Sequence, residues 1–139
     1  MDFAAVGFAG FLGAITRLAL SKIIKFGVFG TFPFSTLFIN LTGCFVLSFF
    51  LTLTLERLEI NPRVRLAFGT GFLGAYTTFS TFTVDSLNLI NSNHLLSALI
   101  YILGTSFGSV IFAWLGILLS RLITERKPEE AKDLNLQEE

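Results

Sequence analysis

Long stretches without Asp, Glu, Lys or Arg alternate with short polar segments along the chain. The uncharged stretches are residues 3–16, 26–55, 66–84 and 86–120. A membrane-spanning α-helix needs about 20 predominantly apolar residues, because it rises about 1.5 Å per residue through a hydrocarbon core about 30 Å thick. The pattern therefore predicts an all-α integral membrane protein with four spans, at about 3–24, 34–55, 64–90 and 95–122.

The segments between the predicted spans are typical of loops. Glycines and Pro33 interrupt the first linker, the second linker from Glu56 to Arg63 is charged, and the third is the short polar segment 91–94. We expect residues 1–124 to form one transmembrane domain. Residues 125–139 hold six acidic and three basic side chains, which predicts a charged, flexible C-terminal tail.

Composition narrows the class of protein. The chain is 53% hydrophobic and only 14% charged, whereas soluble domains are about 25% charged. A soluble enzyme, a disordered chain and a disulfide scaffold are therefore excluded. Cys44 has no second cysteine to pair with and lies within a predicted span, so we interpret it as a small apolar filler. Ten basic residues balance ten acidic ones, so no basic field points to nucleic acid. No nucleophile–base pair, metal cluster or phosphate loop is evident, so we expect no enzymatic activity.

The distribution of basic residues predicts an orientation. An even number of spans puts both termini on one side of the membrane, together with the second linker. That side carries Arg57, Arg63, Arg65, Arg121, Arg126 and Lys127, against Lys22 and Lys25 on the other side. This asymmetry favours cytoplasmic termini.

Small residues recur every fourth or eighth position in two of the spans. They are Ala5, Ala9 and Gly13 in the first span, and Gly104, Gly108, Gly116 and Ser120 in the last. Such spacing lets helices approach closely. We interpret both stripes as packing faces, which are large enough to favour association with a second copy.

The third predicted span departs from a plain hydrophobic helix. Gly69, Gly71 and Gly74 precede a run rich in hydroxyl side chains at 77–83, which predicts a helix break near 74–78. A break at membrane depth is tolerated where it lines a cavity or coordinates an ion. Free carbonyl oxygens suit a hard cation such as Na⁺, and the N-terminus of a half-helix suits an anion.

Polar side chains also lie within the second and fourth spans. Asn40 follows Thr36 by one turn, and Tyr101, Thr105 and Ser109 form one stripe at four-residue spacing. Asn40 is equally compatible with helix packing and with an ion pathway.

Four further side chains are candidates for a role in function, and three of them have two interpretations each. Phe79 and Phe82 are three residues apart, so they form either a packing face or a pair of ring edges that attract an anion. Asp85 is the only carboxylate between Glu59 and Glu125, and it is either solvated at a helix end or a buried proton site. Arg17 lies near a span end, where it can snorkel to the interface.

Three stretches together resemble the Fluc (CrcB) fluoride channel family. Residues 74–82 resemble the signature G-G-x-S/T-T-F-S-T-F, residues 10–17 resemble G-x-x-G-A-x-x-R, and residues 35–43 resemble G-T-L-x-x-N-x-x-G. Ala75 and Ser35 each replace a glycine of these motifs, and Asp85 stands where many relatives have Glu. The resemblance extends over residues 3–122.

The resemblance implies an antiparallel, dual-topology dimer of four-span subunits in the cell membrane, with pores along the dimer interface. Homodimers and pairs of homologous chains both occur in the family. A structural Na⁺ would lie at the dimer centre, held by main-chain oxygens of Gly74 and Thr77. Phe79 and Phe82 would contact fluoride, and Asn40 would donate its amide N–H to the anion. The remaining polar track would comprise Thr36, Ser80, Thr81, Tyr101, Thr105 and Ser109, and Arg17 would lie near a vestibule.

The function that the resemblance implies is passive export of cytoplasmic fluoride, which lowers fluoride toxicity. Two other kinds of transport stay open. Proton-coupled fluoride exchange needs a titratable site, for which Asp85 is the only candidate. A small four-span multidrug exporter needs a carboxylate in the first span, and residues 3–24 contain none.

Overall fold

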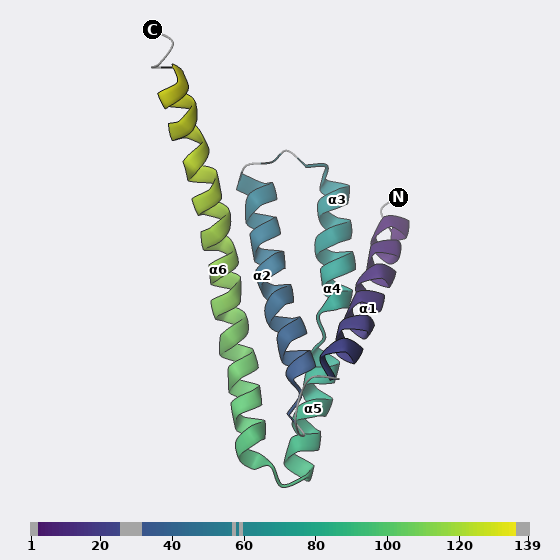
Figure 1. The fold of residues 1–139 in the computed structure, drawn as a ribbon. Helices are drawn as coiled ribbons and strands as arrows, with labels where there is room; N and C mark the ends of the chain where they lie inside the picture. Colours follow the sequence, from purple (N-terminus) through teal and green to yellow (C-terminus); the bar gives the residue numbers. More distant parts are fainter. Residues whose placement is uncertain (1–2, 26–31, 57, 59, 136–139) are drawn as a thin grey trace.

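The computed structural model describes residues 3–25, 32–56, 58 and 60–135, with the side chains of 25 and 125–135 left outside the description. The described part of the chain is helical and contains no strand. Its long helices are α1 (Phe3–Lys25), α2 (Phe34–Glu56) and α6 (Leu95–Asn135). Between α2 and α6 lie α3 (Pro62–Leu66), the π-helix η1 (Ala67–Leu73), α4 (Gly74–Tyr76) and α5 (Phe79–Asn91). The elements from α3 to α5 follow one another end to end (Figure 1), while α2 packs against α6 and α1 packs against η1.

Three helices are long and apolar enough to cross a bilayer: Phe3–Ile24, Phe34–Glu56 and the Leu95–Thr124 part of α6. They match the first, second and fourth predicted spans. The third predicted span is the succession from α3 to α5, which bends after Tyr76. The start of α1, the C-terminal end of α2, the start of α3 and the C-terminal end of α6 all lie toward the same end of the structure (Figure 1). We call this the termini end.

The last helix is longer than the sequence predicts. We expected the fourth span to end near residue 122, but α6 continues to Asn135. Residues 121–135 include several Arg, Glu and Lys residues, which are good helix formers in water, and α6 continues through Pro128. The backbone of 125–135 is therefore helical. The predicted flexibility of the tail concerns side chains 125–135 and residues 136–139, which lie outside the described residues.

Several polar side chains are buried and many large apolar side chains are exposed, unlike in a soluble protein. The buried polar residues include Thr36, Asn40 and Thr54, each at most 9% exposed, whereas Phe8 and Trp114 are 66% and 61% exposed. Exposed apolar side chains lie on every long helix. A continuous apolar surface of this kind is stable in lipid and would aggregate in water.

Glycines set the distance between neighbouring helices. A Cβ at Gly13 would overlap the Phe72 carbonyl, so α1 approaches η1 backbone to backbone. Gly116 lies against Ser48 and the Phe45 carbonyl in the same way, and a Cβ at Gly108 would lie 2.8 Å from Leu41. The predicted packing faces are confirmed at these positions. Gly104 has no neighbour within 4 Å, so its part of the stripe does no packing within this chain.

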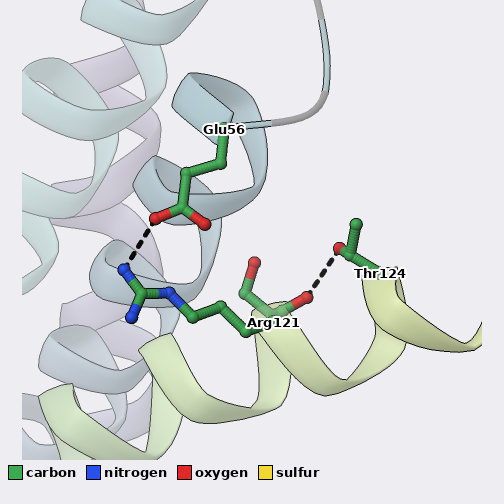
Figure 2. Close-up of polar contacts among 4 residues, drawn as sticks. Glu56, Arg121 and Thr124 are labelled. Atoms are coloured by element: carbon green, nitrogen blue, oxygen red, sulfur yellow. Dashed lines mark hydrogen bonds and ion pairs between the residues drawn. The ribbon is translucent and has the colours of Figure 1, made fainter.

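An ion pair joins α2 to α6 at the termini end. Arg121 Nη2 lies 2.8 Å from Glu56 Oε1 (Figure 2). One turn later the Thr124 hydroxyl donates to the Ser120 carbonyl at 2.8 Å. The Arg121 and Glu56 side chains are 58% and 40% exposed, and exposed pairs contribute about 0–1 kcal/mol. Close packing therefore contributes more than this pair to holding α2 against α6.

Replacing Gly13 by alanine tests the backbone contact between α1 and η1. Because the new Cβ would overlap the Phe72 carbonyl, we expect Gly13→Ala to lower the stability by about 1–3 kcal/mol. Gly7→Ala on the same helix is the matched control, since nothing lies within 4 Å of its Cβ position. Thermal unfolding in detergent measures both, and equal midpoints for the two variants would contradict the contact.

Candidate functional site

The bend between α4 and α5 is built by two threonines. Thr77 and Thr78 have extended backbones, with φ/ψ of −75°/157° and −149°/120°. The Thr77 hydroxyl donates to the Leu73 carbonyl at 2.9 Å and ends α4, while Thr78 Oγ1 accepts from the Thr81 N–H at 3.2 Å and caps α5. Gly74 stays helical, with φ −64° and ψ −33°. The predicted break is confirmed, and the threonine pair rather than the glycine forms it.

Asn40 from α2 satisfies the peptide groups that the break sets free. Its Oδ1 accepts from the Thr78 N–H at 2.9 Å, and its Nδ2 donates to the Thr78 carbonyl at 3.1 Å. Both bonds are buried, where an unpaired peptide group would be costly. Because the Thr78 N–H needs an acceptor, this pairing fixes which end of the carboxamide is oxygen. The second N–H of Nδ2 is left for another acceptor.

A cavity of about 300 Å³ lies beside the break. We call it the central cavity. It is lined by Asn40, Gly43, Cys44, Leu47, Thr77, Thr78, Phe79, Phe82, Thr105, Ser106 and Ser109. The Phe79 and Phe82 ring centroids are 5.7 Å apart, and Phe79 is 79% exposed. The structure thus brings Asn40 and both phenylalanines to one cavity, which is open on the Phe79 side.

A second cavity, of about 640 Å³, is lined by the C-terminal part of α1 and the first turns of α2, and these parts of the two helices lie away from the termini end (Figure 1). We call it the Arg17 cavity. It is lined by Arg17, Leu18, Ser21, Ile24, Phe32, Pro33, Phe34, Ser35, Thr36, Ile39, Thr78, Thr81 and Asp85. The Thr36 hydroxyl donates to Asp85 Oδ2 at 2.7 Å. This bond joins residues 49 positions apart, and no local sequence signal predicts it. Asp85 is therefore neither fully buried nor free at a helix end.

The residues predicted for the polar track separate into three sets. Thr36 and Thr81 line the Arg17 cavity, and Thr105 and Ser109 line the central cavity. Tyr101 is fully buried with its ring centroid 5.3 Å from that of Phe82, and it lines neither cavity. Ser80 also lines neither, and its hydroxyl lies 3.3 Å from that of Thr78.

Some lining residues were missed by sequence reasoning. Cys44 was interpreted as an apolar filler, but it is partly exposed and lines the central cavity. Its position four residues after Asn40 is the signal that places it on the same helix face. Ser106 lines the same cavity.

Main-chain oxygens are the available ligands for a metal near the break. Within the described residues, no group of three or more His, Cys, Asp and Glu side chains lies together. Gly74 is exposed, and nothing in the chain lies within 4 Å of its Cβ position. Thr77 is extended and outside both flanking helices. The described part of the chain therefore leaves the Cβ side of Gly74 uncovered, and main-chain carbonyl oxygens are the kind of ligand that a hard cation takes.

Comparison with known proteins covers most of the chain. Residues 4–117 match the family described as CrcB-like protein, Camphor Resistance (CrcB). The chain is 45% identical over 121 residues to the fluoride-specific ion channel FluC of Trichormus variabilis, covering 85% of this chain and 87% of that protein. It is 46% identical over 118 residues to the fluoride-specific ion channel FluC 2 of Moorella thermoacetica, and the match covers 85% of this chain and 95% of that protein. It is 39% identical over 117 residues to the fluoride-specific ion channel FluC of Aquifex aeolicus, and the match covers 83% of this chain and 93% of that protein.

Removing the threonine cap tests how the break is held. Thr78→Val keeps the branched side chain but loses the oxygen that accepts from Thr81 N–H, which we expect to cost about 0.5–2 kcal/mol. Hydrogen exchange of the first turn of α5 should become faster in Thr78→Val and stay near wild type in Thr78→Ser. Unchanged exchange in the valine variant would mean that the cap does not hold the break.

Proposed function

Because this chain belongs to the CrcB-like protein family, we propose that it is a fluoride-specific ion channel that passively exports cytoplasmic fluoride. The observation that carries the proposal is the similarity to FluC proteins, which runs through every helical segment from α1 to α6. The apolar span-length helices support a multi-pass membrane location. The central cavity beside the break supplies the groups that such a function needs.

Fluoride is small and strongly hydrated, so a pathway must replace its water with hydrogen-bond donors. Asn40, Thr105 and Ser109 line the central cavity and carry donor groups; the Thr105 hydroxyl is buried and has no hydrogen-bond partner in the described part of the chain. The positive ring edges of Phe79 and Phe82 would attract the anion without holding it tightly. An interior-negative membrane potential favours anion exit by about 2.3 kcal/mol per 100 mV.

A second copy of the chain, or a homologous chain, is proposed to complete the pathway in an antiparallel orientation. The open side of the central cavity and the exposed Phe79 ring support this assembly. The exposed backbone at Gly74 supports a shared Na⁺ site, to which each copy would contribute main-chain oxygens of Gly74 and Thr77. When bound, the cation would lower the cost of an anion at the membrane midplane.

Fluoride efflux from liposomes tests the proposed function. Vesicles that contain only the purified chain should release fluoride when a potassium ionophore removes the charge imbalance, and they should retain chloride. A fluoride electrode follows the release. Release no faster than from protein-free vesicles would contradict the proposal.

Two substitutions test the central cavity. Asn40→Asp replaces the only side-chain amide among the residues that line the central cavity by a carboxylate, and Phe79→Ile removes a ring edge. Because a hydrogen bond to a charged group is worth about 1.5–3 kcal/mol, we expect Asn40→Asp to slow efflux about tenfold or more. Phe107→Ile is the control for Phe79→Ile, since Phe107 is also exposed and lines none of the described cavities. Equal rates in the Phe79 and Phe107 variants would remove Phe79 from the pathway.

Asp85 distinguishes a channel from a proton-coupled exchanger, because it lies partly buried in the Arg17 cavity. For a channel, we expect Asp85→Asn to remain conductive and a pH gradient to drive no net fluoride movement in the wild type. If Asp85→Asn abolished efflux and wild-type flux followed the proton gradient, exchange would replace conduction.

A further inference from the structure

A third cavity, of about 340 Å³, lies between α2 and the α3–η1 segment. We call it the Arg65 cavity, after the only charged side chain among its lining residues. Thr70 contributes a hydroxyl, and Leu47 and Leu51 of α2 form an apolar wall. Since α3 begins at Pro62, at the termini end, this cavity lies at the opposite end of the structure from the Arg17 cavity.

The Arg65 side chain is held by a hydrogen bond and forms no ion pair within the described part of the chain. Its Nη2 donates to the Thr54 carbonyl in the last turns of α2, and its Nε is buried without a hydrogen-bond partner in the described part of the chain. A carbonyl oxygen carries only a partial charge. No carboxylate among the described residues forms an ion pair with Arg65. The guanidinium therefore leaves a positive field at this cavity.

The three cavities follow one another along a single face of α2. Thr78 lines both the Arg17 cavity and the central cavity, and Leu47 lines both the central cavity and the Arg65 cavity. On α2 the lining positions Thr36, Asn40, Cys44, Leu47 and Leu51 recur every three or four residues, which places them on one face. From Thr36 to Leu51 this face is about 22 Å long, most of the thickness of a hydrocarbon core.

We propose that Arg65 forms the second mouth of the fluoride pathway, at the termini end, and acts there as an anion-concentrating residue. The proposal rests on the proposed channel function. An arginine then lies at each end of the line of cavities, Arg17 at one and Arg65 at the other. A positive charge at a narrow, low-dielectric opening raises the local concentration of anions. The hydrogen bond to Thr54 positions the guanidinium for this role.

The ionic-strength dependence of fluoride efflux separates this role from a purely structural one. At an ionic strength of about 10 mM, where the Debye length is about 30 Å, we expect Arg65→Gln to slow efflux about three- to tenfold. At about 1 M the Debye length is about 3 Å, and the loss should nearly disappear. Arg65→Lys should resemble wild type at both ionic strengths. Arg63→Gln is the control for a general surface-charge effect, because Arg63 lies two residues away and lines none of the described cavities.

A second variant keeps the test decisive if Arg65→Gln does not fold. Thr70 is exposed in the same cavity, so Thr70→Cys in a Cys44→Ala background can be labelled after folding with cationic or anionic methanethiosulfonate reagents of similar size. At low ionic strength, fluoride efflux through the protein labelled with the cationic reagent should be about threefold or more faster than through the protein labelled with the anionic reagent.

The results of these experiments distinguish a failure of the proposed channel function from a failure of the proposed role of Arg65. If the wild-type protein gave no fluoride efflux, the proposed channel function itself would be contradicted. With wild-type flux present, a loss in Arg65→Gln that is the same at both ionic strengths, or equal rates for the two adducts, would overturn the role of Arg65.

Discussion

The architecture depends on the paired hydrogen bonds between the Asn40 carboxamide and the Thr78 peptide. Lipid offers no partner for a peptide N–H or carbonyl, so an interrupted helix is stable in a membrane only if another element supplies the missing bonds. Asn40 does so from α2, at 2.9 and 3.1 Å. The same two bonds orient the amide, place Thr78 as the cap of α5, and leave an N–H that is free to serve another acceptor. Structural and functional requirements therefore meet in one side chain.

Much of this arrangement follows from sequence because a bilayer imposes simple rules. Uncharged stretches of sufficient length predicted the spans, and glycines followed by threonines predicted the break, which lies at Thr77–Thr78. The contact between Thr36 and Asp85 could not be predicted, because 49 residues separate the two side chains and only folding brings them together. The length of α6 was underestimated, since hydropathy marks where a helix leaves the membrane and not where it ends.

The predicted site residues illustrate the same distinction. The central cavity is lined by five of the predicted residues, Asn40, Phe79, Phe82, Thr105 and Ser109. The family resemblance groups Tyr101 and Ser80 with them, but these two residues do not line this cavity. Helical spacing places a residue on a face, but the tilt of neighbouring helices decides whether that face borders a cavity. Cys44 was overlooked for the opposite reason, since its apolar character concealed a position on the cavity-lining face of α2.

The π-helix η1 affects which side chains of this segment face the same direction. In an α-helix, residues five apart are rotated by about 140° from one another, because each residue turns about 100°. In a π-helix the hydrogen bond runs from residue i to i+5, so the turn is wider and residues five apart are rotated from one another by a smaller angle. Arg65, just before η1, and Thr70, within it, are five apart and line the same cavity. The wide turn thus shifts the phase of the helix: at ordinary α-helical pitch, the same five-residue spacing would turn the hydroxyl and the guanidinium about 140° away from each other.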